Sequence, residues 1–254
     1  MSTLGVVVPA FRPDTDRLRS YIHDLGSELD PAVIRVELDD PDAGTEQALS
    51  AIELPSLEVR SVRHRRGKGA AITAGFEALS TDRLAFADAD GSTPAAELVR
   101  VVAALGTADL AVGSRRHPDS TIVGHRTLVR RFLGDGFAWI ARRALDPPLY
   151  DYQCGAKALT DDAWEALRQH LYEPGFAWDL ELIAVAGALG VSVREVPIAW
   201  TDRPGSTVDP VRTSLSMAAA LAVTRHRAKR LQNSSFHRAI ARDEGPTALV
   251  ERRR

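Results

Sequence analysis

Residues 84–94 read Leu84-Ala-Phe-Ala-Asp88-Ala-Asp90-Gly-Ser-Thr-Pro94 and join the end of one structural element to the start of another. The apolar run 84–87 predicts a buried strand. The final Ser-Thr-Pro is typical of a helix start, because a hydroxyl side chain can cap the first turn and proline fits the first helical position. We therefore predict a strand, an acidic turn and a helix in direct succession.

The same alternation of strand and helix recurs along the first half of the chain. Further apolar runs rich in Val, Leu and Ile predict strands at 6–8, 33–38, 57–62 and 110–112. Helical patterns fall between them at 16–29, 44–52, 70–79 and 94–105. Such an order predicts an α/β fold with a doubly wound, mostly parallel sheet, whose ligand sites lie beyond the carboxyl ends of the strands.

The second half of the chain has a different pattern. Residues 124–145 carry apolar side chains at helical spacing, interrupted by Gly134-Asp135-Gly136, and predict a pair of Arg-rich helices. Helices are expected at 161–170 and 178–189, and a strand at 193–200. We divide the chain into a main domain over 1–210, a basic amphipathic helix over 211–231 and a polar tail over 232–254 that we expect to pack poorly.

Composition limits the function classes. The 254 residues include 44% hydrophobic side chains, enough for one domain with a full core. A formal net charge of -2 gives no global field for nucleic acid, so we expect no nucleic-acid partner. The single cysteine, Cys154, favours a reducing compartment. No leader segment and no apolar run of membrane-spanning length is evident, so we expect a cytoplasmic protein.

The acidic turn and two basic turns are the candidate sites for chemistry. Asp88 and Asp90 stand at alternate positions of an extended chain, so both carboxylates can reach one hard cation. An Asp-Gly turn with no ligand is the alternative. The Gly-rich turn around Lys68 and the arginines that follow the strand at 110–112, Arg115 first, suit an anion. For these basic turns, a solvated loop is the alternative.

Three other features leave more than one interpretation open. The Arg-rich helices of 124–145 suit either an anionic lipid surface or packing against the core. Asp179 either caps its helix or faces the site. Cys154 has no adjacent histidine to activate it, so we expect a packed thiol and no nucleophile.

Taken in order along the chain, the motifs resemble those of the family-2 glycosyltransferases, and most closely the dolichyl-phosphate glucosyl- and mannosyltransferases. The resemblance covers residues 4–209 and depends on short segments at 8–11, 39–40, 66–69, 88–94, 113–115, 153–155, 179–181 and 195–197. Each motif alone is weak, but eight in the same order are specific.

The resemblance implies a fold of the nucleotide-sugar transferase (GT-A) type, with the amphipathic helices on one side. The residues it implies for donor binding are Pro9, Ala10, Phe11, Asp39, Lys68, Asp88, Ala89, Arg203 and Ser206. The implied ligands of Mg²⁺ or Mn²⁺ are Asp88 and Asp90. The implied catalytic residues are Asp90, Arg115, Arg130 and Asp179.

The implied reaction is metal-dependent and inverting, and it moves a hexose from a UDP-sugar, favoured over a GDP-sugar, onto polyprenyl or dolichyl phosphate. The enzyme is expected to sit peripherally on the inner face of the cell membrane, with residues 124–145 at the lipid surface. Two alternatives stay open at this point. One is a glycosyltransferase with a soluble acceptor, and the other is a noncatalytic module that binds a nucleotide or a lipid phosphate.

Overall fold

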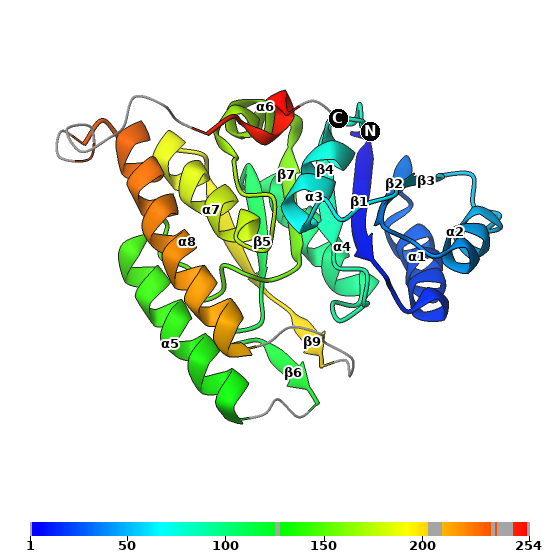
Figure 1. Ribbon diagram of the computed structural model, residues 1–254, viewed down its shortest axis with the longest axis horizontal. Helices are drawn as coiled ribbons and strands as arrows, with labels where there is room; N and C mark the ends of the chain where they lie inside the picture. The colour runs from blue at the N-terminus through cyan, green and yellow to red at the C-terminus, as the bar shows by residue number, and fades with distance from the viewer. Residues whose placement is uncertain (1, 125–127, 203–209, 235–236, 238–245, 253–254) are drawn as a thin grey trace.

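A seven-stranded sheet with helices on both faces forms the centre of the molecule (Figure 1). This computed structural model describes residues 2–124, 128–202, 210–234, 237 and 246–252, and for residues 128–134 and 210–215 it describes the backbone alone. The strand order is β3-β2-β1-β4-β7-β5-β8, and every pairing is parallel except those of β7. The predicted α/β fold with a doubly wound, mostly parallel sheet is confirmed.

The elements alternate as the sequence predicts. The strands of the main sheet are β1 (Leu4–Phe11), β2 (Val33–Asp39), β3 (Leu57–Val62), β4 (Arg83–Ala87), β5 (Leu110–Ser114), β7 (Ala156–Thr160) and β8 (Val193–Pro197). The α-helices are α1 (Thr15–Leu29), α2 (Ala43–Ser50), α3 (Lys68–Phe76), α4 (Ala95–Ala103), α5 (Leu128–Ala144), α6 (Asp161–Leu167), α7 (Trp178–Leu189) and α8 (Pro210–Leu231). Short 3₁₀ helices are η1 (Ala104–Gly106), η2 (Arg168–His170) and η3 (Leu249–Glu251).

Two hydrophobic cores lie on opposite faces of the sheet. In β1, Val6 and Val8 belong to the core beneath α1 and α4, whereas Val7 belongs to the core beneath α3, α6 and α7. This division follows from the pleat, because successive side chains of a strand point to opposite faces. The second core includes two buried tryptophans, Trp164 and Trp178. Both faces are therefore covered, as a parallel sheet requires.

Strand β7 runs against its neighbours and brings a distant segment to the carboxyl edge of the sheet. Its first residue, Ala156, pairs with Ala87 at the end of β4, so Gly155 lies beside Asp88. The backbone N–H of Asp88 donates to the Gly155 carbonyl oxygen at 2.9 Å. Segments that follow β1, β2, β4 and β5 thus share one edge with the segment that precedes β7.

Two sequence predictions of secondary structure are wrong in detail. The expected strand at 193–200 is split: β8 pairs with β5, and β9 (Ala199–Thr201) pairs with β6 (Thr121–Val123) in a separate two-stranded sheet. The expected helix pair is one continuous helix, α5. Gly134 and Gly136 do not break it, because an interior glycine costs a helix only about 1 kcal/mol relative to alanine.

Helix α8 packs on α7 and α5 at the side of the sheet farthest from α1 (Figure 1). The division of the chain at residues 210 and 231 stays a prediction. Much of the tail lies outside the described residues, but Leu249 is buried and its N–H donates to the Leu171 carbonyl at 2.8 Å. This part of the tail therefore packs, contrary to the expectation. No described helix has the length and apolar character needed to cross a bilayer.

Candidate functional site

The two aspartates that follow β4 lie close together at the carboxyl edge. The Asp88 side chain is 41% exposed, and Asp90 is also exposed. Gly91 adopts φ +61°, and the Ser92 N–H donates to Asp90 Oδ1 at 2.9 Å, which fixes the turn. Burial, followed by the negative charges of Asp88 and Asp90, raises the pKa of Tyr21 above its ordinary value. The Tyr21 hydroxyl therefore lies close enough to both carboxylates for their charges to act on its pKa.

Gly155 makes room for the Asp88 carboxylate. A Cβ at this position would lie 1.7 Å from Asp88 Oδ2, so no residue with a side chain fits while Asp88 keeps its place. The requirement is one of close approach, because the φ of Gly155 is not in the left-handed region. The loop before β7 therefore acts as a cradle for the carboxylate.

The carboxylate oxygens at this turn are suitable ligands for a divalent cation that prefers oxygen. Among the described residues no group of three or more His, Cys, Asp or Glu side chains gathers to hold a metal. Magnesium and manganese need no such cage, because Mg²⁺ is usually held by one or two carboxylates, with phosphate and water oxygens completing its shell. Asp88 and Asp90 would be the protein ligands, and the other positions would be open to a phosphorylated molecule.

A buried chain of charges begins at Asp88. Lys68 Nζ lies 2.9 Å from Asp88 Oδ1 and 2.8 Å from Asp179 Oδ2. Lys157, which is fully buried, donates to Asp179 Oδ1 and to the Cys154 carbonyl oxygen. Burial alone would lower the pKa of Lys68, but the charges of Asp179 and Asp88 offset this and raise it. Lys68, which pairs with both Asp88 and Asp179, therefore stays cationic at neutral pH.

Asp179 lies inside the protein. It is 2% exposed, and its two oxygens accept from Lys68 and Lys157. Burial raises the pKa of Asp179, but the two lysines outweigh burial and lower it. The sequence left two roles open for Asp179, capping its helix or facing the site. Its carboxylate points toward the two lysines, and the first turn of α7 has no side-chain cap. It is held ionised and away from solvent.

Arg115 lies on the same edge as Asp88. Its Nε and Nη2 donate to Asp151 Oδ2 at 2.7 Å and Oδ1 at 2.9 Å, a bidentate pair. Burial would lower the pKa of Arg115, but Asp151 raises it, with a smaller contribution from Asp88. Glu195 accepts from the N–H groups of Tyr150 and Asp151 at 2.9 Å and thereby fixes the loop. Arg115 is thus a cation held by Asp151 at the same edge of the sheet as the acidic turn.

Several residues predicted to bind the nucleotide lie at the ends of β1 and β2. Asp39 is 2% exposed and accepts from the Arg66 N–H at 2.7 Å, from Arg66 Nε at 2.7 Å and from the Gly67 N–H at 3.1 Å. Its carboxylate therefore fixes the 65–69 turn that carries Lys68. Phe11 is 38% exposed, and the Arg65 guanidinium lies 4.3 Å from its ring centroid.

The remaining predicted residues are placed less fully. Pro9 and Ala10 pair with Glu37 and Leu38 in β1 and β2, and Ala89 lies between the two aspartates, half-buried. Arg130 belongs to α5, but its side chain is outside the described part. Arg203 and Ser206 also lie outside the described residues.

The structure adds residues to which the sequence assigned no role: Gly155, Lys157, Asp151 and Glu195. A lysine within an apolar run is the one local signal that points to Lys157, because an unpaired buried lysine is costly. Cys154 is buried, and burial raises the pKa of its thiol to about 12. The expectation of a packed thiol is confirmed.

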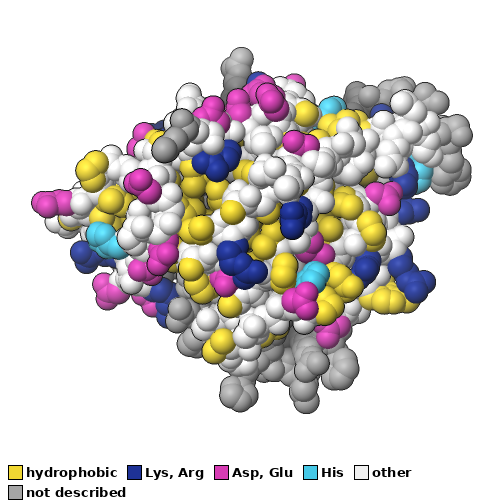
Figure 2. Space-filling view, turned by 180° about the vertical axis from the view of Figure 1, so that it is seen from behind, with side chains coloured by type: hydrophobic (Ala, Val, Ile, Leu, Met, Phe, Trp, Pro, Cys, Tyr) yellow, Lys and Arg dark blue, Asp and Glu magenta, His cyan; other side chains and the backbone are white. Residues whose placement is uncertain are grey.

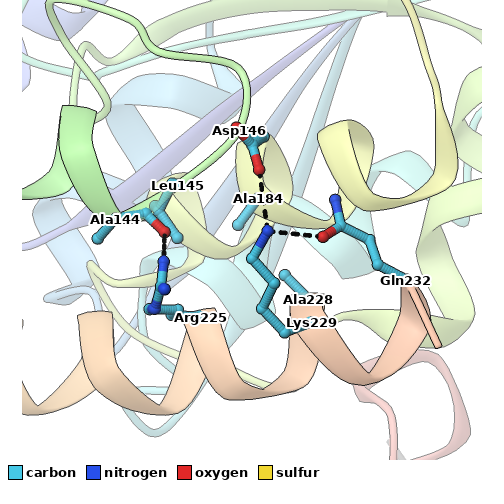
Figure 3. A pocket seen from close by; sticks show the side chains of 8 residues that line it. All are labelled: Ala144, Leu145, Asp146, Ala184, Arg225, Ala228, Lys229 and Gln232. Carbon is cyan, nitrogen blue, oxygen red and sulfur yellow. Dashed lines mark hydrogen bonds and ion pairs between the residues drawn. The ribbon is translucent and has the colours of Figure 1, made fainter. Parts of the chain in front are cut away.

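A small pocket marks where α8 meets the end of α5 (Figure 3). The Arg225 guanidinium donates to the Ala144 carbonyl at the last residue of α5. Lys229 Nζ lies 3.1 Å from Asp146 Oδ2 and 2.8 Å from Gln232 Oε1, and these side chains point toward one another (Figure 3). These contacts fix α8 against the end of α5. The residues that make them are far in sequence from the acidic turn.

The outer face of α5 combines apolar and basic side chains. Trp139 is 59% exposed and Ile140 is 51% exposed, and the Arg143 guanidinium lies 4.3 Å from the Trp139 ring centroid. The face shown in Figure 2 mixes acidic, basic and apolar side chains without a single-sign area. An exposed aromatic beside arginine is typical of contact with a lipid interface, although each residue alone would be ordinary.

Comparison with known proteins places these features in a family. Residues 6–164 match the family described as glycosyl transferase family 2. Glycosyltransferase AglD of Haloferax volcanii is 31% identical over 228 residues, 86% of this chain and 36% of AglD. The dolichyl-phosphate beta-glucosyltransferase of Dictyostelium discoideum is 29% identical over 234 residues, 85% of this chain and 71% of that protein. The chain therefore spans about a third of AglD and most of the second relative.

Solved structures share the fold. Glucosyl-3-phosphoglycerate synthase from Mycobacterium tuberculosis, in a complex with Mn²⁺, UDP and glucosyl-3-phosphoglycerate, superposes with a TM-score of 0.67 at 19% identity, covering 88% of this chain and 80% of that one. Mannosyl-3-phosphoglycerate synthase from Rubrobacter xylanophilus gives 0.70 at 18% identity, covering 92% and 78%. The predicted GT-A type of fold is confirmed.

Proposed function

Because the chain belongs to glycosyltransferase family 2, we propose that it transfers a hexose from a UDP-sugar to polyprenyl or dolichyl phosphate, with Mg²⁺ or Mn²⁺ held by Asp88 and Asp90. The observation that carries this proposal is the acidic pair at the carboxyl edge, with Asp88 seated against Gly155 and bonded to Lys68. The relatives named as dolichyl-phosphate glucosyltransferases support glucose and the lipid acceptor. The Mn²⁺ and UDP of the mycobacterial complex support the donor and the metal.

The proposed donor site uses the ends of three strands. Pro9, Ala10 and Phe11 after β1 would line the nucleotide, and Asp39 would act through the 65–69 turn that it holds. Lys68 lies at the N-terminus of α3, where helical N–H groups and its own ammonium both favour phosphate. Ala89, Arg203 and Ser206 complete the proposed donor-binding set.

The proposed catalysis is alignment and charge neutralisation. When bound, the metal ion would neutralise negative charge on the departing diphosphate. An acceptor phosphate monoester has a second pKa of about 6, so its oxygen is already anionic at neutral pH and needs no strong base. This oxygen forms the new bond to the anomeric carbon while the bond to the diphosphate oxygen breaks on the opposite face, which inverts the centre and gives a β-linked product from an α-linked donor.

Three cationic side chains would serve this displacement. Arg115, kept rigid by Asp151, would hold a phosphate, and Arg130 is proposed for the same task. Lys68 would stabilise the leaving diphosphate. Asp179 is proposed to position Lys68, since it is buried and shared by two lysines. Asp90, the more exposed carboxylate, would contact the metal directly.

The membrane contact is proposed for the outer face of α5. Trp139 and Ile140 are exposed there with Arg143 beside them, a combination that suits the boundary between acyl chains and anionic headgroups. Binding would be peripheral, on the cytoplasmic face. An acceptor whose chain lies in the bilayer would then present its phosphate to the carboxyl edge.

The decisive experiment supplies purified protein with UDP- and GDP-hexoses, polyprenyl phosphate and Mg²⁺ or Mn²⁺, and detects a lipid-linked hexose by mass spectrometry. Asp90→Asn should lower metal-dependent transfer at least about 100-fold, a loss comparable to that of one preorganised charge-stabilising group. Asp162→Asn, an exposed aspartate at the opposite edge on α6, is the matched control and should retain activity.

Two outcomes would overturn parts of the proposal. Release of UDP without any dependence on lipid would replace the lipid acceptor by a soluble one. Binding of nucleotide with no turnover of any hexose tested, unchanged by Asp90→Asn, would indicate a noncatalytic module.

A further inference from the structure

The segment at 171–175, which precedes α7, lies directly against the turn that carries Lys68. The Ala70 N–H donates to the Pro174 carbonyl oxygen at 3.0 Å. A Cβ on Gly67 would lie 2.5 Å from the same oxygen, and a Cβ on Gly69 would lie 2.5 Å from the Glu173 oxygen. The two backbones are therefore in contact, and a shift of the 171–175 segment would move the Lys68 turn.

A fully buried carboxylate holds the 171–175 segment in place. Glu181, in the first turn of α7, is 0% exposed, and its Oε2 accepts from the N–H groups of Tyr172 and Glu173 at 2.7 and 2.8 Å. Burial raises the pKa of Glu181 above its ordinary value, although the two N–H groups and Arg227 act against this. Such a carboxylate needs a cation to stay charged inside the protein.

Arg227 of α8 is that cation. Its Nη1 lies 2.6 Å from Glu181 Oε1 and 3.3 Å from Glu173 Oε1, and its guanidinium lies 4.8 Å from the Tyr172 ring centroid. The tail contributes as well, because Arg252 Nη2 donates to the Tyr172 carbonyl at 2.8 Å. Helix α8 therefore reaches the Lys68 turn through Glu181 and the 171–175 segment.

We propose that Arg227 is a positioning residue for the nucleotide-diphosphate site, acting through the Glu181 carboxylate and the 171–175 segment on the turn that carries Lys68. This inference rests on the proposed function for the identity of the ligand. It assigns a role to α8, which would hold the 171–175 segment against the turn that carries Lys68.

The test compares Arg227→Met with Lys229→Met. Both variants remove one cation of α8 that pairs with a carboxylate outside this helix. Arg227 pairs with Glu181, whereas Lys229 pairs with Asp146, which follows α5. Hydrogen exchange of the Ala70 amide reports the contact with Pro174 without any ligand. Calorimetric titration with UDP in the presence of MnCl₂ measures the dissociation constant of the proposed donor site.

Arg227→Met should speed exchange at Ala70 and raise the dissociation constant for UDP about fivefold, an effect of the size reported for residues that couple to a site without touching its ligand. Lys229→Met should match the wild type in both measurements, and Arg227→Lys should fall between the two. Should Arg227→Met fail to fold, Arg227→Lys carries the same comparison.

Equal exchange at Ala70 in Arg227→Met and the wild type would overturn the inference. So would equal effects of Arg227→Met and Lys229→Met, which would show a general loss of α8 docking. Failure of the wild-type protein to bind UDP would instead refute the proposed donor, and the exchange measurement would still decide the role of Arg227.

Discussion

Gly155 controls the position of the Asp88 carboxylate, because Oδ2 occupies the space that a Cβ would need. We expect Gly155→Ala to displace Asp88 and to weaken Mn²⁺ binding about tenfold or more, as loss of an outer-shell partner commonly does. Manganese titration followed by electron paramagnetic resonance measures this without turnover.

The control for that substitution is Gly136→Ala. Among the described residues no atom lies within 4 Å of a Cβ at this helical glycine, so the variant should bind Mn²⁺ like the wild type and be slightly more stable. Unchanged Mn²⁺ affinity in Gly155→Ala would show that Asp88 does not hold the ion.

Asp151 should make a pH-dependent contribution to stability. Burial raises its pKa, but Arg115 outweighs burial and lowers it well below the ordinary value. A depressed pKa means that the contribution is complete above the ordinary value near ~4 and is lost as the pH falls through the folded-state pKa. The ion pair therefore stabilises the protein at neutral pH and fails in acid.

We expect Asp151→Asn to cost about 3 kcal/mol at pH 7, since it leaves a buried guanidinium without its partner. The difference from the wild type should shrink by about 1 kcal/mol at pH 3, where the unfolded wild type already binds the proton. Urea unfolding at the two pH values measures both quantities. A difference that grows in acid would contradict the depressed pKa.

At the scale of elements, α5 is the helix proposed to contact lipid. Trp139→Ser with Ile140→Ser should lower flotation with anionic vesicles several-fold, because each large apolar side chain contributes about 1.5–3 kcal/mol when fully buried and partial insertion supplies a fraction of this. Leu189→Ser removes an exposed leucine from the last residue of α7, outside α5, and is the control. Equal flotation of all three proteins would leave α5 without a role at the membrane.

The elements also show what the sequence can predict. Helix α7 has the predicted bounds, because Gly190 adopts φ +74° and ends it where a glycine follows the apolar run. The strand expected at 193–200 is too long, because Trp200 pairs with Ile122 in a second sheet. This pairing depends on a partner far away in the sequence, which the local pattern does not contain. A local sequence pattern identifies individual helices and strands, whereas the pairing of strands depends on tertiary contacts.

The site divides in the same way. Asp88 and Lys68 were found because each follows a strand, and the carboxyl ends of parallel strands meet. Gly155 and Lys157 were not assigned roles, because these depend on an antiparallel strand inserted between β4 and β5. Asp179 is buried between lysines from α3 and β7, an arrangement that no single segment of sequence contains.

At the scale of the whole molecule, ligand binding at the carboxyl edge should stabilise the fold. A ligand at 100 times its dissociation constant adds about 2.7 kcal/mol if it binds only the folded state. For a domain of this size that corresponds to an increase in melting temperature of about 5 to 10 °C. The increase should need UDP and Mn²⁺ together, because the proposed metal site is completed by diphosphate oxygens and has only two protein carboxylates.

Thermal melts with UDP alone, Mn²⁺ alone and both ligands separate the possible causes. Asp90→Asn should lose the joint increase while melting near the wild-type temperature without ligands, since Asp90 is exposed and its described bond is to the local Ser92 N–H. Were UDP alone to give the full increase in both proteins, nucleotide binding would be independent of the acidic pair. Since the metal is proposed to link those carboxylates to the sugar-bearing diphosphate, that result would remove the basis for metal-dependent transfer at this edge.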